Sequence, residues 1–330
     1  MVELGVNLNN RETLLSNDYT LEEMFEIATE AEELEYSSVW VGDSLLEKPR
    51  PEPISCLSTV AGKTESVDLG TACMLTPLRN PIQFAQEWAT LDMISGGRTI
   101  VGACMGAASS GLAKKQYEAV GIPPRKRPLV LREQIEIVKT LWKEGTVTYS
   151  GDYFEFEDVT FDTGNEVNQL EPVQDEVPFW VISNPSSQGN DAVHGPAVKR
   201  IVDVGDGWMT CCRANHPEEY EAQIAAIKSY ADEQGVDMDD IDTCYQVTLN
   251  ISDSKEEARK DMNDYLGSYY PSRHGGDLEE WGPIGDAQEV IDWIHQFDEL
   301  GCEHFVLRFG ATDQREQMRR FAEEVLPSFR

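Results

Sequence analysis

The chain has 330 residues, enough for one large domain with a single core or for two medium ones. Its formal net charge of −33, from 60 acidic and 27 basic residues, repels phosphate and argues against nucleic acid or an anionic membrane surface as a partner. No apolar run reaches the roughly 18 residues of a membrane span and no signal-peptide pattern opens the chain, so we expect a cytoplasmic protein.

The first half of the chain alternates short apolar runs with amphipathic segments. We expect strands at Leu4–Leu8, Ser38–Val41, Val67–Met74 and Thr99–Cys104, and helices near 20–35, 54–64, 82–94 and 128–143. Ser95-Gly96-Gly97 stops the third helix, because glycine tolerates the left-handed conformation at a helix end. A strand, a helix and a strand joined this tightly predict a right-handed crossover between parallel strands.

The second half resumes the same rhythm after an irregular stretch, about 146–178, which predicts an insertion that begins with a hairpin. Further strands are expected at Phe179–Ile182, Gly207–Thr210, Cys244–Ile251 and His304–Phe309, and helices near 197–204, 217–234, 254–266, 286–300 and 313–325. A loop at about 267–285, rich in Tyr, Gly and Trp, is expected on the substrate side.

Eight strands that alternate with helices admit a closed barrel or a doubly wound sheet. The strand count, the chain length and the absence of a G-x-G-x-x-G run after the first strand favour the barrel. We therefore predict a single (β/α)8 TIM-barrel domain over residues 1–330, with insertions at the C-terminal face.

The predicted C-terminal strand ends are where a barrel concentrates its chemistry. They hold few carboxylates and no close pair, which disfavours glycosidase chemistry, and no His-rich spacing that predicts a metal. No serine elbow indicates acyl transfer. Small residues, thiols and Met remain, and they suit a planar organic cofactor that carries the reaction.

One run of residues carries a family resemblance. Residues 70–106 read GTACMLTPLRNPIQFAQEWATLDMISGGRTIVGACMG, and this run resembles the bacterial-luciferase-like superfamily. The blocks at 38–43 and 200–208 match it as well. That superfamily includes flavin-dependent monooxygenases and coenzyme F420-dependent oxidoreductases. The resemblance implies a (β/α)8 barrel with its cofactor at the C-terminal face, and we expect a homodimer or higher homo-oligomer.

The resemblance also implies residue roles. Asp43 matches the acidic residue near the ring, and Cys73-Met74 fall where F420 enzymes carry a non-proline cis peptide bond. Cys104 falls where luciferase has a reactive thiol, and the 183–195 loop with Arg200 falls where cofactor phosphate is bound. The expected cofactor contacts are Asn7, Asp43, Cys73, Met74, Cys104, Met105, Gly106, Ser183, Asn184 and Arg200. The expected catalytic residues are Asp43, Cys104 and His194.

Three positions depart from the family pattern. Ser44 stands where the sugar-phosphate dehydrogenases and luciferase have His, and Ala107 stands where those dehydrogenases have their catalytic Glu. Asn7 stands where the methylenetetrahydromethanopterin reductases have a catalytic Glu. The sequence therefore predicts the cofactor more firmly than the substrate.

The leading hypothesis is an F420-dependent oxidoreductase that transfers a hydride between the deazaflavin and a small organic substrate. An FMN-dependent, luciferase-like monooxygenase is the first alternative, and Cys104 would suit it. A non-catalytic protein that binds flavin or F420 is the second.

The seven cysteines are odd in number and show no C-x-x-C pair. With no secretory signal in the sequence, we expect all of them to be reduced thiols.

The dispersed acidic residues and the scarcity of Lys resemble proteins of salt-loving archaea. In such a protein salt screens the self-repulsion of the folded state. We predict that the melting temperature rises as KCl is raised to about 2 M, a range in which the Debye length falls below about 3 Å. A melting temperature that is the same at low and molar salt contradicts this prediction.

Overall fold

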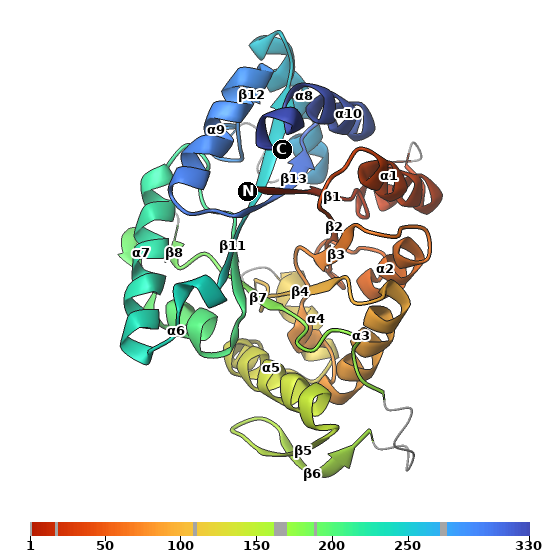
Figure 1. Ribbon diagram of the computed structural model, residues 1–330, viewed down its shortest axis with the longest axis vertical. Coiled ribbons are helices and arrows are strands. Elements are labelled where there is room, and N and C mark those ends of the chain that lie inside the picture. The colour runs from red at the N-terminus through yellow and green to blue at the C-terminus, as the bar shows by residue number, and fades with distance from the viewer. Residues whose placement is uncertain (1, 17–18, 108–110, 162–169, 188–189, 271–275) are drawn as a thin grey trace.

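Eight parallel strands close into a ring in this computed structural model, and helices surround the ring (Figure 1). The structure describes residues 2–16, 19–107, 111–161, 170–187, 190–270 and 276–330. The strands of the ring, in order, are β1 (Glu3–Asn7), β2 (Ser38–Val41), β3 (Asp68–Thr71), β4 (Thr99–Ala103), β7 (Phe179–Ile182), β10 (Gly207–Thr210), β11 (Asp242–Ile251) and β13 (His304–Phe309). Pairing of β10 with β11 and of β13 with β1 closes the ring, so the predicted barrel is confirmed.

The helices alternate with these strands along the chain. They are α1 (Leu21–Glu33), α2 (Pro53–Ala61), α3 (Pro81–Ser95), α4 (Gly111–Ala119), α5 (Arg127–Glu144), α6 (Gly195–Val204), α7 (Pro217–Gln234), α8 (Lys255–Tyr269), α9 (Ala287–Glu299) and α10 (Gln314–Glu324). Local signals set their ends: Thr20 accepts a hydrogen bond from the N–H of Glu23 at the start of α1, and α3 ends at Gly96 with φ of 73°. Within the described residues, no helix has the length and apolar character to cross a membrane.

Two tryptophans fill the inside of the ring. Trp40 from β2 and Trp180 from β7 stack with ring centroids 5.2 Å apart, and both are fully buried. Gly70 on β3 leaves the space that Trp40 occupies, since a Cβ at that position would lie 2.2 Å from the indole. A larger apolar layer, which includes Leu57, Trp88 and Phe297, packs between the strands and the outer helices. The tryptophans separate the polar groups of the C-terminal rim from those at the N-terminal end, where their indole N–H groups donate to Ser38 and Asp242.

The insertion at 146–178 lies elsewhere than predicted. Its described part begins with the hairpin of β5 (Thr146–Ser150) and β6 (Glu155–Thr160), which lies on the outside of α5 (Figure 1). The buried carboxylate of Glu133 on α5 accepts hydrogen bonds from backbone N–H groups of the hairpin turn. The side-chain amide of Gln174 donates a hydrogen bond to the carbonyl of Thr99, the first residue of β4. The expected position at the C-terminal face is wrong for this segment, because α5 has already returned the chain to the N-terminal end of the barrel.

Two other additions cover the C-terminal face. Helix α4, which the sequence did not predict among its small residues, follows β4, and its Tyr117 donates to the carbonyl of Met105 at 2.6 Å. Helix α8 follows β11, and with β12 (Ile284–Gly285) and the loop between them it forms a small apolar cluster of its own. This region brings Tyr269 and Tyr270 against Arg308 of β13.

Close packing of β3 against β4 gives a test of the barrel geometry. A Cβ on Gly102 would lie 1.8 Å from the carbonyl oxygen of Thr71, a backbone atom that cannot move without separating the strands. We predict that Gly102→Ala lowers the free energy of unfolding by about 3 kcal/mol. The control is Gly111→Ala, where a Cβ meets no atom within 4 Å. Equal melting temperatures for the two variants would contradict the close packing of these strands.

Candidate functional site

A cavity of about 170 Å³ lies at the rim where the strands β1, β2, β3, β11 and β13 end. Three of the predicted cofactor contacts line it: Asn7, Asp43 and Cys73. The Oδ1 atom of Asn7 is buried and has no hydrogen-bond partner among the described residues. The cavity also holds residues that the sequence analysis did not assign to the site, among them Arg50, Gln246 and Arg308.

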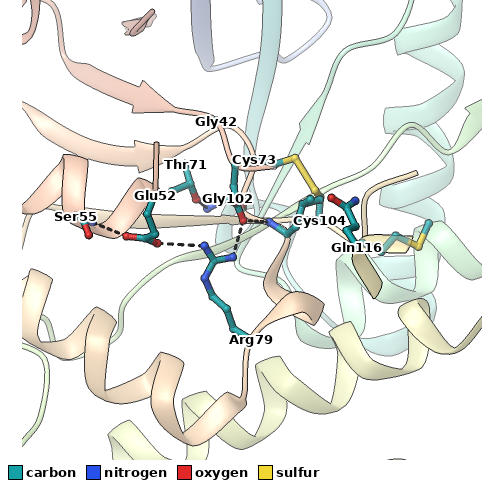
Figure 2. Close-up of polar contacts among 12 residues, drawn as sticks. Gly42, Glu52, Ser55, Thr71, Cys73, Arg79, Gly102, Cys104 and Gln116 are labelled. Carbon is teal, nitrogen blue, oxygen red and sulfur yellow. Dashed lines mark hydrogen bonds and ion pairs between the residues drawn. A yellow bond between two sulfur atoms is a disulfide. The ribbon is translucent and has the colours of Figure 1, made fainter. Parts of the chain in front are cut away.

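Asp43 holds the segment that follows β3. Its carboxylate forms an ion pair with Arg79 at 2.5 Å and accepts a hydrogen bond from the N–H of Leu75 at 3.0 Å. Its own N–H donates to the carbonyl of Cys73. Arg79 makes a second ion pair, with Glu52, as Figure 2 shows. These contacts commit the carboxylate to positioning the β3 segment beside the cavity.

A non-proline cis peptide bond joins Ala72 to Cys73. The resemblance placed it at Cys73-Met74, so the prediction is one residue too late along the chain. Beyond the bond, the N–H of Met74 donates to the carbonyl of Gly102, and the side chain of Met74 is packed in the apolar core. The backbone at Ala72–Cys73 faces the cavity, whereas the Met74 side chain does not line it.

Cys73 and Cys104 form a disulfide across the ends of β3 and β4, with Cα atoms 6.0 Å apart (Figure 2). The expectation that all seven cysteines are reduced is therefore wrong for these two. It failed because the cysteines are distant in sequence and meet only when the adjacent strands end at one rim. While the disulfide is closed, Cys104 has no thiol, so its predicted catalytic role applies to the reduced form alone.

The turn after β4 is fixed by contacts from α4 and α5. Gly106 has φ of 59°, a left-handed conformation that glycine adopts without a steric penalty. Arg127 of α5 donates to the carbonyls of Met105 and Gly106. Met105 and Gly106 thus lie beside the disulfide, on the rim where the sequence placed them.

Ser183 and Asn184 follow β7 on the far side of the ring from β1. The Asn184 side-chain oxygen accepts from the Thr210 hydroxyl and from the N–H of Cys211, each at 2.9 Å. The Ser183 carbonyl accepts from the indole N–H of Trp208. These bonds tie the ends of β7 and β10 together, so both predicted contacts also support the rim itself.

The first turn of α6 is open to a ligand. His194 precedes it, is exposed and provides no side-chain cap, and a Cβ on Gly195 would meet no atom within 4 Å. Pro196 has no N–H, and the N–H groups of Ala197 and Val198 donate to the His194 carbonyl, so the positive end of the helix dipole is what favours a phosphate here. Arg200 lies on the same helix with its Nε buried and without a partner, and burial lowers its pKa. His194 and Arg200 do not line the central cavity.

The barrel brings together what the sequence singled out at the ends of β1 to β4, and it places Ser183, Asn184 and α6 across the ring. Arg308 had a sequence signal, since it is the one charged residue inside the apolar run from Phe305 to Phe309. Arg50 had none, because the segment between β2 and α2 shows no periodicity that predicts its direction.

The closed parallel ring with a polar cavity at its C-terminal rim defines a (β/α)8-barrel protein of the kind that binds its ligand at that rim. Within this class, the chain belongs to the luciferase-like monooxygenase family, whose model matches residues 2–304. The family resemblance seen in the sequence is thereby confirmed.

Individual relatives span almost the whole chain. An F420-dependent glucose-6-phosphate dehydrogenase from Amycolatopsis mediterranei is 25% identical, over 93% of this chain and 94% of that protein. Among solved structures, a monooxygenase from Streptomyces bottropensis has a TM-score of 0.79 at 21% identity and covers 99% of this chain and 100% of its own. An F420-dependent secondary alcohol dehydrogenase, solved with an F420–acetone adduct, has a TM-score of 0.77 at 21% identity and covers 100% of this chain and 99% of its own. The two structures show the same fold.

The ion pair of Asp43 and Arg79 provides a test. Their side chains are only 8% and 17% exposed, so removal of the cation leaves a largely buried carboxylate unpaired. We predict that Arg79→Ala lowers the free energy of unfolding by about 3 kcal/mol. The control is Arg132→Ala, which breaks an exposed pair with Glu136 and costs about 0.5 kcal/mol. Similar losses in chemical denaturation of both variants would show that Asp43 does not depend on Arg79.

Proposed function

We propose that this protein is a coenzyme F420-dependent oxidoreductase, which transfers a hydride between the deazaflavin and a small organic substrate. The observation that carries the proposal is the rim cavity lined by Asn7, Cys73 and Gln246, in a chain that aligns along nearly its full length with an F420-dependent dehydrogenase. When bound, the deazaflavin supplies a ring carbon that accepts or donates the hydride.

The residues present fit such a cofactor. Asn7 and the amide of Gln246 line the cavity and offer polar groups to the edge of a ring placed against the rim beside it. The start of α6 offers the positive end of the helix dipole, beside the open space at Gly195, to the cofactor phosphate. We propose that the Ala72–Cys73 backbone, held by Asp43, backs the ring and keeps it in one position.

The substrate is proposed to differ from that of the dehydrogenase relative, which acts on glucose 6-phosphate. Two of the three positions that depart from the family pattern bear on this. Ser44 is buried, and its hydroxyl accepts a hydrogen bond from the N–H of Lys48. Ala107 is exposed and has no titratable group. Neither residue replaces the acid and base that the resemblance assigns to the sugar-phosphate dehydrogenases.

An FMN-dependent monooxygenase is the second candidate, favoured by the description of the family to which the chain belongs. Its support from the sequence was a free thiol at Cys104, and the disulfide removes that thiol. A non-catalytic binding protein would bind the same cofactor and differ only in the absence of turnover. We further propose that the protein acts as a homo-oligomer in a salt-rich cytoplasm, as its acidic composition suggests.

Cofactor binding at α6 gives the direct test. We predict that the protein, purified in molar KCl, binds F420 at micromolar concentration and binds FMN at least 10-fold more weakly, as measured by fluorescence titration. Gly195→Asp adds a negative charge beside the proposed phosphate, and we expect it to weaken F420 binding at least 10-fold. Gly195→Ala is the matched control, because its Cβ enters open space. Tight FMN binding without F420 binding would falsify the proposed cofactor.

Turnover separates the enzyme from a binding protein. The oxidation of reduced F420 is measured with a panel of carbonyl and unsaturated substrates, with and without oxygen. We expect the same rate in both conditions. Turnover that requires oxygen supports the monooxygenase instead, and binding without turnover supports the non-catalytic alternative.

A further inference from the structure

Three arginines gather on one side of the rim cavity, in a chain whose net charge is −33. Arg11 follows β1, Arg50 follows β2 and Arg308 lies on β13, so they come from three adjacent positions of the ring. Arg11 and Arg308 are each 8% exposed, and Arg50 is partly buried. We call these three residues the arginine cluster.

The partners of the cluster are neutral. Arg308 donates from Nε to the Thr248 hydroxyl at 2.8 Å and from Nη1 to the Tyr270 hydroxyl at 3.1 Å. Arg50 donates from Nη2 to the Tyr269 hydroxyl at 2.7 Å, and Arg11 donates to the Tyr269 carbonyl. Arg50 also donates from Nη1 to the Lys48 carbonyl at 3.3 Å. These bonds fix the directions of the guanidinium groups without forming an ion pair.

Aromatic rings provide the rest of the surroundings. The guanidinium carbon of Arg308 lies 5.2 Å from the ring centroid of Tyr269, 5.5 Å from that of Tyr270 and 5.6 Å from that of Trp281. That of Arg11 lies 4.4 Å from the Tyr269 centroid. Cation–π contacts of this kind stabilise a guanidinium by less than a buried cation loses on leaving water.

Two carboxylates, Glu12 and Asp43, line the same cavity without an ion-pair contact to the cluster. Glu12 accepts hydrogen bonds from Tyr265 and Gln314, and its charge acts on Arg50 from a distance, whereas Asp43 is paired with Arg79. Considering only the described parts of the chain, no carboxylate is in ion-pair range of Arg11, Arg50 or Arg308. Arg213 differs: on the same rim, it pairs with Glu219. A buried cation without a counter-ion is costly, so the cluster is incomplete without an anion.

The open donors of the cluster reach the cavity. Arg50 and Arg308 line it together with Ala72, Cys73 and Gln246. The Nε of Arg50 is not one of these donors, because it is packed beside Gly42 and shielded from the cavity. The volume of 170 Å³ corresponds to roughly six water molecules, so the anion there is a small group. The uncapped start of α6 follows β7, opposite β1 in the ring, and is thus separate from the cluster.

We propose that Arg50 and Arg308 clamp an oxyanion group of the substrate, so that the substrate class is a small organic acid or phosphate ester. This inference rests on the proposed function, because it places the anion beside the ring site of the cofactor. A guanidinium presents a planar fork of N–H donors, which matches two oxygens of a carboxylate or of a phosphate. Both kinds of anion are therefore expected to bind.

An ionised Tyr270 is a competing explanation of how the positive charge of Arg50 and Arg308 is balanced. Burial alone would raise the pKa of its phenol, but the charges of Arg308 and Arg50 outweigh burial and lower this pKa. A phenolate at this position would itself neutralise part of the cluster. The two explanations differ in whether an added anion binds.

The test measures binding of oxalate, acetate and inorganic phosphate to the protein with and without F420, at pH 7 in molar KCl. The readouts are the rise in melting temperature and the change in tryptophan fluorescence, to which Trp281 contributes because it stacks on Tyr270 at 5.1 Å. We expect the anions to raise the melting temperature of the wild type. Arg50→Gln and Arg308→Gln should each weaken binding at least 10-fold. Arg308→Lys keeps the charge without the fork, so an intermediate loss is expected.

Two controls separate a clamp from a structural role. Arg213→Gln, at a rim arginine that already has a carboxylate partner, should bind the anions as the wild type does. Without anion, Arg50→Gln should be at least as stable as the wild type, because it removes an uncompensated charge, whereas loss of a structural arginine would lower the melting temperature.

The outcomes also distinguish this inference from the proposed function. Binding of F420 without binding of any of the three anions overturns the clamp and leaves the cofactor assignment intact. A tyrosinate absorbance at pH 7 in that case assigns the counter-ion to Tyr270. Anion binding that depends on Arg50 and Arg308 without F420 binding overturns the proposed function and retains the anion site. Anion binding unchanged in both Gln variants overturns the clamp.

Discussion

Closure of β10 onto β11 is the constraint on which the site depends. Because all eight strands of the ring are parallel, closing it brings every C-terminal strand end to one rim. Trp40 and Trp180 fill the interior below that rim and separate its polar side chains from those at the N-terminal end of the barrel, such as Asp242. The cavity, the disulfide and the arginine cluster are all consequences of this arrangement.

Several residues expected to act on a cofactor prove to shape the rim as well. Asp43 holds the segment after β3 through Arg79, and Asn184 ties β7 to β10. Cys104 is bonded to Cys73 while the disulfide is closed. A cofactor ring needs a rigid wall, and a buried ion pair next to that wall supplies the rigidity at the cost of desolvation. Positioning and chemistry therefore share the same few residues.

The negative charge of the molecule lies mostly on its surface, and part of its positive charge lies inside the rim. The acidic residues that dominate the composition are largely exposed, while Arg50 and Arg308 are turned inward among tyrosines. A strongly acidic surface repels small anions in bulk solution, but molar salt screens that repulsion within a few ångströms. Buried guanidinium groups are screened much less, so an anion that reaches the cavity is held by short-range contacts.

The sequence by itself determined the order of strands and helices, the barrel and the family, because periodicity, caps and the motif at 70–106 are local properties of the chain. It also located most of the rim through the strand ends. Only the tertiary structure decided that Cys73 bonds Cys104, that the 146–178 insertion leaves the C-terminal face, and that Arg50 meets Arg308. These features depend on which segments, distant in sequence, the closed ring brings together. No local sequence pattern encodes such contacts.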